Sequence, residues 1–307
     1  MSDTLASLRG KISGADKLKS VVRTMKAMAA SSIGQYENAV QSLGDYERTV
    51  TLGLSACFRQ AGPVVTPHFQ QNEHKVIGAI VFGSDQGLVG QFNDVMGRFV
   101  MDKLDKLPGE KKIWVVGERL HAILGDANLP LFGPYGVPNS ATAITQLVGR
   151  IQIDCEAHRP HSEFDYDQET IYVFHNAPLS GSQYQPVCQR LLPLDAEWQR
   201  NITAIPWPTK NLPEAIGMKT GRESETGNEL LRALLREYLF ISLFKACAES
   251  LVSENASRLA AMQRAEKNIN ELSTVLSRTF YRLRQNSIDE ELFDVVAGSN
   301  ALGNKVR

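Results

Sequence analysis

One stretch, residues 228–297, constrains the fold of this chain more than any other. It runs from Asn228 to Ala297 without a glycine or a proline, whereas helices of globular proteins usually span about 8–20 residues. At a rise of about 1.5 Å per residue, one helix of this length would measure roughly 105 Å. Such a helix is several times longer than a small domain, so it needs partners along its side.

Two heptad seams on this stretch indicate which side a partner covers. The first seam is nearly all apolar and comprises Leu234, Ile241, Ala248, Asn255, Met262, Ile269, Leu276 and Leu283. The second is mixed and comprises Leu231, Tyr238, Lys245, Val252, Leu259, Glu266, Ser273 and Phe280. The pattern predicts an imperfect coiled coil in which one partner helix follows the stretch over most of its length.

The partner is expected at the N-terminus, where a helical pattern runs from about Leu5 to Ala56. N-cap candidates precede it at residues 2–4, and small side chains such as Ala15 and Ala29 at seam positions favour a close approach. Each glycine in a helix costs about 1 kcal/mol relative to alanine, so tertiary packing must hold this one together. The glycines concerned are Gly10, Gly14, Gly34, Gly44 and Gly53.

Strand and helix patterns alternate between the two long helices. Strand patterns cover Lys75–Phe82, Lys112–Val116 and Glu169–Phe174, helix patterns cover Asp94–Leu107, Glu118–Asp126 and Ser140–His158, and Gln183–Leu194 is a candidate edge strand. The proline- and glycine-rich stretches at 130–138 and 204–227 are interpreted as turns and a loop-rich return, and residues 62–67 as a linker. Strands separated by helices predict βαβ units on a mostly parallel, Rossmann-like sheet.

The predicted fold is therefore an α/β domain inserted into a long antiparallel two-helix coiled coil. We expect three regions, 1–60, 61–210 and 211–307. If both helices start near the domain, roughly the last 15–20 residues of the second have no partner, or about 25 Å of helix. The tip of this overhang is apolar, because Leu292, Phe293, Val295 and Val296 lie on it and no charge follows Asp294 until Lys305. An exposed apolar end must be enclosed by another protein, unless a kink folds it back onto the coil.

Composition excludes several classes of protein. The net charge is -1, so no global electrostatic attraction to nucleic acid is expected, although the first thirty residues form a local basic face. The four cysteines lie far apart in the sequence and include no CxxC pair, which is typical of reduced, buried thiols in a cytosolic-type compartment. No apolar run reaches the length of a membrane span, and no secretory signal is recognisable.

Two short motifs could carry chemistry, and each has a simpler structural interpretation. Residues 83–90 (GSDQGLVG) follow a strand and precede a helix, where α/β proteins bind phosphate. Their spacing is not GxGxxG, and Asp85 would repel phosphate, so a structural turn is favoured. Cys155, His158 and His161 have metal-like spacing but no evident further ligand. We expect no catalytic residue, no metal and no cofactor, since the common enzyme motifs are also missing.

Three regions of the chain resemble the gamma subunit of F-type ATP synthases, the central rotor shaft. Residues 25–31 (MKAMAAS) resemble the family's N-terminal helix motif, and residues 84–93 (SDQGLVGQFN) resemble its SDRGLCGGFN loop. Residues 254–262 (ENASRLAAM) and 284–298 (RQNSIDEELFDVVAG) resemble its C-terminal helix, which ends in an RQxxITxELxEIVxGA-like signature. The resemblance covers both ends and the domain order, hence essentially the whole chain.

Several positions depart from that pattern. Gln86 replaces the arginine of the loop, Val89 its cysteine and Gln91 its second glycine, while Asp289 replaces the threonine of the signature and Ser299 its alanine. The basic residues that usually follow Ser31 are also missing. These departures are typical of a divergent branch, such as a second, alternative F-type ATPase of a bacterium.

The resemblance implies a non-catalytic rotor subunit that couples rotation of the c-ring to ATP synthesis or hydrolysis on the alpha/beta ring. The coil would lie inside the alpha/beta ring, and the α/β domain would lie on the c-ring beside epsilon. The subunit would be a peripheral protein at the cytoplasmic face of the bacterial inner membrane, and it would not bind nucleic acid. Contacts with the alpha/beta ring are expected from Met25, Lys26, Arg258, Arg284, Gln285, Asp289, Glu291, Leu292 and Val295. The loop of the foot domain would contribute Asp85, Gln86 and Gly87.

Other interpretations of these residues and of the whole chain stay open. Met25 could pack in the core, and Arg258 could form an exposed salt bridge within the coil, in which case its replacement by alanine should barely affect folding. The chain itself could be a nucleotide-binding α/β enzyme dimerised through its helices, or a static coiled-coil scaffold.

Overall fold

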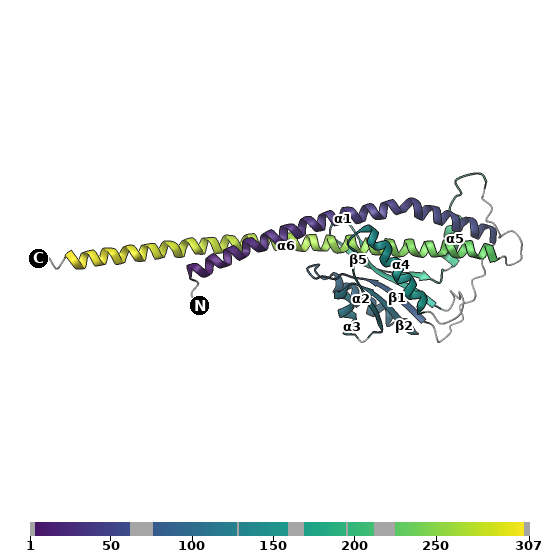
Figure 1. Cartoon of the computed structure of the whole chain (residues 1–307), viewed down its shortest axis with the longest axis horizontal. Helices are drawn as coiled ribbons and strands as arrows, with labels where there is room; N and C mark the ends of the chain where they lie inside the picture. The colour runs from purple at the N-terminus through teal and green to yellow at the C-terminus, as the bar shows by residue number, and fades with distance from the viewer. Residues whose placement is uncertain are drawn as a thin grey trace. The chain divides into compact units, whose positions relative to one another are not determined.

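The computed structural model describes residues 4–61, 76–127, 129–158, 169–194, 196–211 and 225–303 (Figure 1). Its elements in chain order are α1 (Leu5–Ala61), β1 (Val76–Phe82), α2 (Phe92–Leu104), β2 (Glu110–Val116), α3 (Glu118–Gly125), β3 (Leu131–Tyr135), α4 (Ala141–Ala157), β4 (Glu169–Pro178), β5 (Tyr184–Leu192), α5 (Ala196–Ala204) and α6 (Glu225–Gly303). The expected linker at 62–67 and most of the return at 204–227 lie outside the described residues.

Both long helices exceed the lengths that the sequence patterns predict. Helix α1 has 57 residues and α6 has 79. At the start of α1, Thr4 Oγ1 accepts a hydrogen bond from Ser7 N at 3.3 Å, as an N-cap residue does. Every position of the first α6 seam, from Leu234 to Leu283, is buried or half-buried. The predicted pairing of the two terminal helices is therefore confirmed.

The chain divides into two compact units, to each of which α1 and α6 contribute. One unit contains Met1–Ala29 and Leu259–Arg307, and the other contains Ala30–Arg258. The division into regions 1–60, 61–210 and 211–307 stays a prediction.

A five-stranded sheet in the order β3-β2-β1-β4-β5 forms the centre of the unit 30–258. Strands β3, β2, β1 and β4 are parallel, and β5 is an antiparallel edge strand next to β4. The mostly parallel sheet and the edge strand are thus as predicted. Its central strand β1 is buried from Ile77 to Phe82, as expected of a parallel strand that is covered on both faces.

Different helices cover the two faces of this sheet (Figure 1). Helices α2 and α3 pack on one face through Met96, Val100, Leu120 and Leu124, which join alternate β1 and β2 residues in one apolar cluster. On the other face, α4 and the parts of α1 and α6 within this unit bury residues such as Tyr36, Ile151 and Phe244. Helix α4 starts where expected, because Ser140 Oγ accepts a hydrogen bond from Ala143 N at 3.3 Å.

Two elements were not expected from the sequence. Strand β3 lies in the stretch interpreted as turns, and it pairs with β2 although it contains Gly133 and Pro134. It borders only β2, and edge strands are where a sheet tolerates the missing N–H of a proline. Helix α5 precedes the return and contributes Trp198 and Ile202 to an apolar cluster with α1 and α6.

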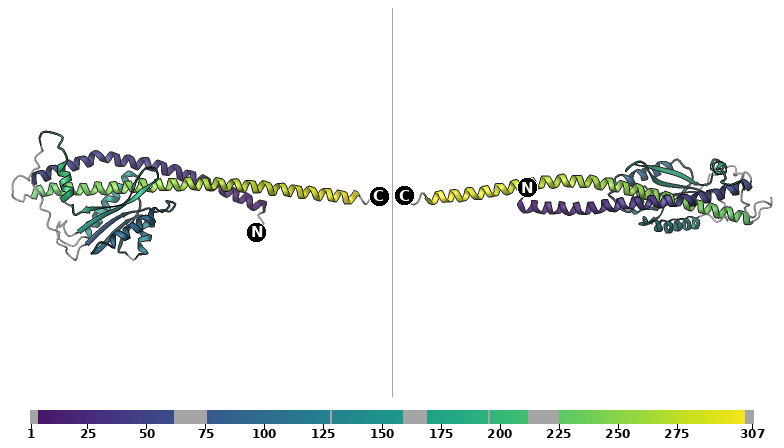
Figure 2. Two further views of the ribbon diagram at one scale, coloured as in Figure 1. Left: turned by 180° about the vertical axis from the view of Figure 1, so that it is seen from behind. Right: turned by 90° about the horizontal axis from the view of Figure 1, so that it is seen from above.

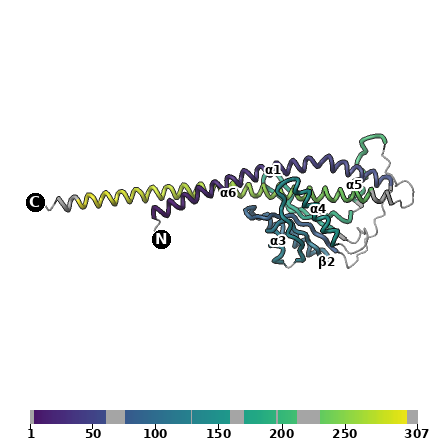
Figure 3. The backbone as a smooth tube through the Cα atoms, viewed as in Figure 1, coloured from purple at the N-terminus to yellow at the C-terminus, as the bar shows by residue number. Residues whose placement is uncertain are grey.

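In the other unit, α1 and α6 run antiparallel, and α6 continues beyond the start of α1 (Figures 2 and 3). The guanidinium of Arg9 lies 5.8 Å from the ring centroid of Phe280. Because α1 begins at Leu5, residues of α6 beyond about 285 have no neighbour in the described part of α1, which leaves roughly 25 Å of helix. The predicted overhang is thus confirmed, and α6 does not fold back before Gly303.

Candidate functional site

The loop between β1 and α2 is held by Asp85. Its Oδ1 accepts a hydrogen bond from Glu118 N at 3.1 Å, and its Oδ2 accepts one from Val137 N at 2.9 Å. Both carboxylate oxygens are thus directed at backbone donors of neighbouring segments. Gln86 and Gly87 are exposed next to it. This arrangement supports the interpretation of the loop as a structural turn.

A second bond pair stiffens the same loop from α2. Asn93 Oδ1 accepts a hydrogen bond from Ser84 N at 3.0 Å, and Asn93 Nδ2 donates one to Ser84 Oγ at 2.8 Å. Ser84 Oγ in turn donates to Gln86 O at 2.9 Å. Ser84 N and Oγ are therefore bonded to Asn93 of α2 and to the loop itself, and the Ser84 carbonyl accepts a hydrogen bond from Arg119 N at 3.0 Å.

Helix α6 contacts the carboxyl end of β4 and the loop that follows β1, on the side of the sheet where open α/β proteins generally bind ligands. Ser257 Oγ donates to Val89 O at 2.5 Å, and Ser253 Oγ donates to the backbone O of Asn176 at 2.8 Å. One turn earlier, Glu249 Oε2 lies 2.9 Å from His175 Nε2. The position of a ligand in a nucleotide-binding domain is thus occupied here by the protein's own helix.

Arg258 forms an ion pair on α6, but the pair is not exposed. Its Nη2 lies 2.7 Å from Glu254 Oε1, and the two side chains are 16% and 6% exposed. Burial raises the pKa of Glu254 to about 7, although Arg258 acts in the opposite direction and nearby Asp85 adds to the rise. The expectation that this pair is exposed is therefore wrong. Removal of Arg258 would leave a carboxylate buried without its partner, so we expect the pair to matter for folding.

Glu266 joins α6 to the N-terminal part of α1. Its two carboxylate oxygens lie 2.6 Å from Lys26 Nζ and 2.9 Å from Arg23 Nε. The hydrogen bonds from Lys26 and Arg23 lower the pKa of Glu266 to about 2. Met25, between the two basic residues, is half-buried. Lys26 is thus engaged within the coil, while 37% of its side chain stays exposed.

We expect Glu266→Gln to remove a pH-dependent contribution to stability. The folded-state pKa of Glu266 lies below the unfolded value, so its contribution is present above the unfolded pKa and is lost as pH falls through the folded pKa. The variant should therefore be less stable than wild type at pH 7, and the difference should shrink towards pH 2. Urea unfolding across this pH range measures it, with Glu271→Gln, on an exposed pair, as the control. An equal loss at both ends of the range would contradict the assignment.

The remaining predicted contact residues lie along the overhang of α6. Arg284, Gln285, Asp289, Glu291, Leu292 and Val295 are all exposed. Phe293 and Val295 are 72% and 69% exposed, so the apolar end is open to solvent in the isolated chain. These residues share one helix but converge on no pocket.

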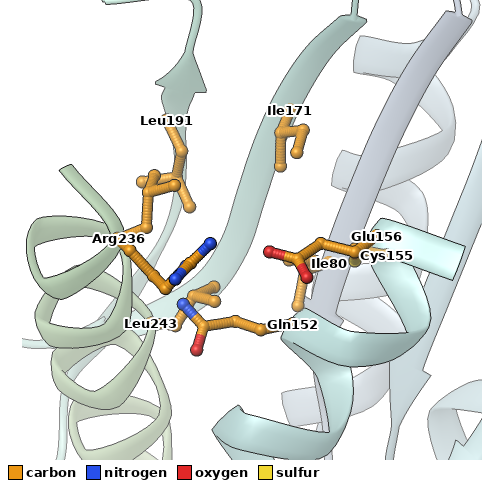
Figure 4. A pocket seen from close by; sticks show the side chains of 9 residues that line it. Ile80, Gln152, Cys155, Glu156, Ile171, Leu191, Arg236 and Leu243 are labelled. Atoms are coloured by element: carbon orange, nitrogen blue, oxygen red, sulfur yellow. The ribbon is translucent and has the colours of Figure 1, made fainter. Parts of the chain in front are cut away.

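No metal-binding cluster is found among the described residues, although they line an open hollow of about 360 Å³ beside Tyr172, Cys188, Arg190 and Trp198. No group of three or more His, Cys, Asp or Glu side chains with metal-binding geometry occurs among them; Cys155 is buried while His158 is exposed, and His161 lies outside the described residues. A cavity of about 40 Å³ between α4 and α6 is lined by polar groups of Gln152, Glu156 and Arg236 and by apolar side chains such as Ile171 and Leu191 (Figure 4). Ligand sites typically measure about 300–1,000 Å³, so this one accommodates only a few water molecules.

No helix within the described ranges is both long and apolar enough to span a bilayer.

Comparison with known proteins connects this architecture to one family. The chain is 26% identical over 308 residues to the ATP synthase gamma chain of Syntrophus aciditrophicus (strain SB), covering 97% of this chain and 98% of that one. It is 24% identical to the ATP synthase gamma chain of Janthinobacterium sp. (strain Marseille), with 96% and 98% covered. The sequence model of the ATP synthase family matches residues 4–302. This chain belongs to the ATP synthase gamma-chain family.

Solved structures show the same fold. One chain of the Euglena gracilis mitochondrial ATP synthase, in a structure of OSCP/F1/c-ring in rotational state 3, superposes with a TM-score of 0.66 at 18% identity, covering 99% of this chain and 96% of that one. A chain from the rotor of the same synthase in rotational state 1 gives a TM-score of 0.59, covering 92% and 98%. The gamma-chain fold therefore extends over both long helices and the sheet.

Three features of this gamma-family chain were missed by sequence reasoning, namely the burial of Glu254, the Glu266 bridges and the serine contacts of α6. Glu266 did carry a signal, because a charged residue at a coil seam usually specifies a partner. Glu254 carried none, since it lies outside both seams and looks like an exposed helical residue.

Proposed function

We propose that this chain is the central-stalk rotor subunit of an F-type ATP synthase. In this role it is itself non-catalytic and couples ion-driven rotation of the c-ring to ATP synthesis or hydrolysis on the alpha/beta ring. The observation that carries the proposal is the overhang of α6, whose apolar side chains are exposed beyond the start of α1. An uncharged, apolar helix end suits rotation inside a protein sleeve, because it offers few strong bonds to break.

The partners follow from this role. The coil would contact the alpha and beta subunits, and the α/β domain would contact epsilon and the c-ring. The complex would lie at the cytoplasmic face of a bacterial inner membrane, with this chain peripheral and touching the membrane only through its partners. The departures at Gln86, Val89 and Asp289 support a divergent branch, such as an alternative F-type ATPase.

The proposed contacts with the alpha/beta ring fall into two groups. Arg284, Gln285, Asp289 and Glu291 would form transient polar contacts below the apolar tip, where Leu292 and Val295 turn. The second group comprises Met25, Lys26 and Arg258. The exposed parts of these side chains would contact the ring farther from the tip. In the loop of the α/β domain, Asp85 would hold the loop through its hydrogen bonds to the backbone. Gln86 and Gly87 would lie at the surface of the loop.

The nucleotide-binding alternative is disfavoured by the position of α6. Ser253 bonds the carboxyl end of β4 and Ser257 bonds the loop after β1, so a nucleotide on this side of the sheet would have to displace a helix. Tight one-to-one binding of ATP or NAD by the isolated chain would overturn the rotor proposal. A static scaffold would instead sediment as a stable, self-paired dimer.

Purification from the native membrane tests the proposal directly. With an affinity tag placed on the α/β domain, we expect the alpha, beta and epsilon subunits to co-purify with this chain. A preparation that contains this chain alone, or as a homodimer, would contradict the proposed function.

Truncation after Asp294 should separate folding from coupling. The removed residues include Val295 and Val296, which are exposed, so we expect the free energy of unfolding to change by less than about 0.5 kcal/mol. Coupling or assembly with the alpha/beta ring should weaken, as measured by ATP-driven ion pumping in membrane vesicles. Loss of the folded α/β domain on truncation, seen by circular dichroism, would refute the overhang argument.

A further inference from the structure

We propose that a row of three side chains on α6, namely Glu249, Ser253 and Ser257, is the mechanical connection through which the α/β domain and α6 turn together. This inference rests on the proposed rotor function and names residues that would carry its load. We call these three side chains the α6 contact row.

The spacing of the contact row places it on one stripe of the helix. Its members are four residues apart, so their positions repeat about every 6 Å along the helix axis. Each has its own contact: Glu249 contacts His175 and Ser253 contacts the backbone O of Asn176, both near the end of β4, and Ser257 contacts the backbone O of Val89 in the loop between β1 and α2. A stripe bonded at three successive turns resists rotation of the helix about its own axis.

Hydrogen bonds are suited to this task because they are directional. Apolar packing depends on the area removed from water and has no preferred direction. A hydrogen bond weakens steeply when its angle changes, so it opposes rotation of the helix more strongly than apolar packing does. The serine contacts are also shielded from water, since Ser253 and Asn176 are 1% and 0% exposed, while the side chain of Glu249 is 24% exposed. Breaking either serine bond would remove a hydrogen bond from a buried carbonyl, and Val89 O would keep only its bond from Phe92 N at 3.4 Å, which makes the loss costly.

The receiving side of the row is held by bonds of its own. Asn176 Nδ2 donates to Phe92 O at 3.4 Å and so joins the end of β4 to the start of α2. The loop that contains Val89 is held by the Asn93–Ser84 bond pair and by Asp85. Force applied at the row would therefore pass into the sheet rather than into a flexible loop.

Hydrogen exchange on the assembled complex provides the first test. In the Ser253→Ala/Ser257→Ala variant, each lost bond should raise local opening about fivefold to tenfold, so amide protection around residues 253–257 and 175–176 should fall about 25- to 100-fold. The matched control is Ser42→Ala/Ser242→Ala, which removes two serine bonds that lie within single helices. Protection equal to that of the control would overturn the proposal.

Ion pumping against an opposing gradient provides the second test. We expect the row variant to hydrolyse ATP like the control when this chain is assembled with alpha and beta subunits alone, where the domain carries no load. In membrane vesicles, the ions pumped per ATP hydrolysed should fall below the control as the opposing gradient rises. A ratio equal to that of the control, despite lost protection, would make the row merely structural. Failure of the wild-type complex to pump would instead count against the rotor function itself.

Discussion

Replacement of Arg258 by alanine should lower the free energy of unfolding by about 3 kcal/mol at pH 8.5, as expected when one partner of a buried ion pair is removed. The cause is Glu254, whose side chain is 6% exposed and lies 2.7 Å from Arg258. Without the guanidinium, this carboxylate must either stay ionised in the interior or take up a proton from a solution in which protons are scarce. Either outcome disfavours the folded state.

The same loss should shrink to about 1 kcal/mol at pH 5, the value of ordinary hydrogen bonds. The folded-state pKa of Glu254 is raised to about 7, above the ordinary value of 4.5 for a glutamate. Its contribution to stability is therefore fully present below pH 4.5 and is lost as pH rises through the folded pKa. Removing Arg258 raises this pKa further, so the variant continues to lose stability above pH 7 where wild type no longer does.

Urea unfolding between pH 5 and pH 8.5, followed by the fluorescence of buried Trp114, measures both values. The double variant Glu254→Gln/Arg258→Ala should recover most of the loss at pH 8.5, because its neutral amide needs no counter-charge. Arg264→Ala, on an exposed part of α6, should change stability by less than about 0.5 kcal/mol. A loss for Arg258→Ala that is equal at both pH values would show that Arg258 stabilises by packing alone.

Sequence patterns located the large elements because periodicity survives wherever one face of an element is buried. The α6 seam, the β1 strand and the Ser140 cap each depend on a local rule of spacing or capping. The overhang could also be predicted, because it follows from the lengths of the two helices and from the insertion of the domain between them. The resemblance to gamma subunits then added the function, which no residue pattern in the chain shows by itself.

The features that escaped prediction depend on tertiary structure. Strand β3 was missed because Gly133 and Pro134 lower strand propensity, and only its place at the edge of the sheet makes them acceptable. Glu254 was missed because the helix face outside the seams was taken to be in water. That face is buried because the sheet presents its carboxyl edge, with Val89 and Asn176, directly to α6.

Gly117, in the connection between β2 and α3, should not tolerate any side chain. Its φ of 104° is one that side chains rarely adopt, and an added Cβ would lie 2.7 Å from Ser84 N and 2.8 Å from Gly83 C. Both neighbours are backbone atoms, and Ser84 is held by Asn93, so the obstruction cannot rotate away. The strain of about 1–3 kcal/mol adds to an overpacking cost of similar size.

We therefore expect Gly117→Ala to lower the free energy of unfolding by about 3 kcal/mol or more, measured by the same urea titration. Gly149→Ala is the matched control, since it lies in α4 with no atom within 4 Å of an added Cβ and should stabilise the chain by about 1 kcal/mol. Gly117 also donates to Tyr135 O at 2.8 Å, so a shifted backbone would disturb β3 and the Asp85 loop together. A loss below about 1 kcal/mol would mean that the β2–α3 connection can move away from Ser84. The β1–α2 loop would then not be rigid enough to hold Val89 in place for the α6 contact row.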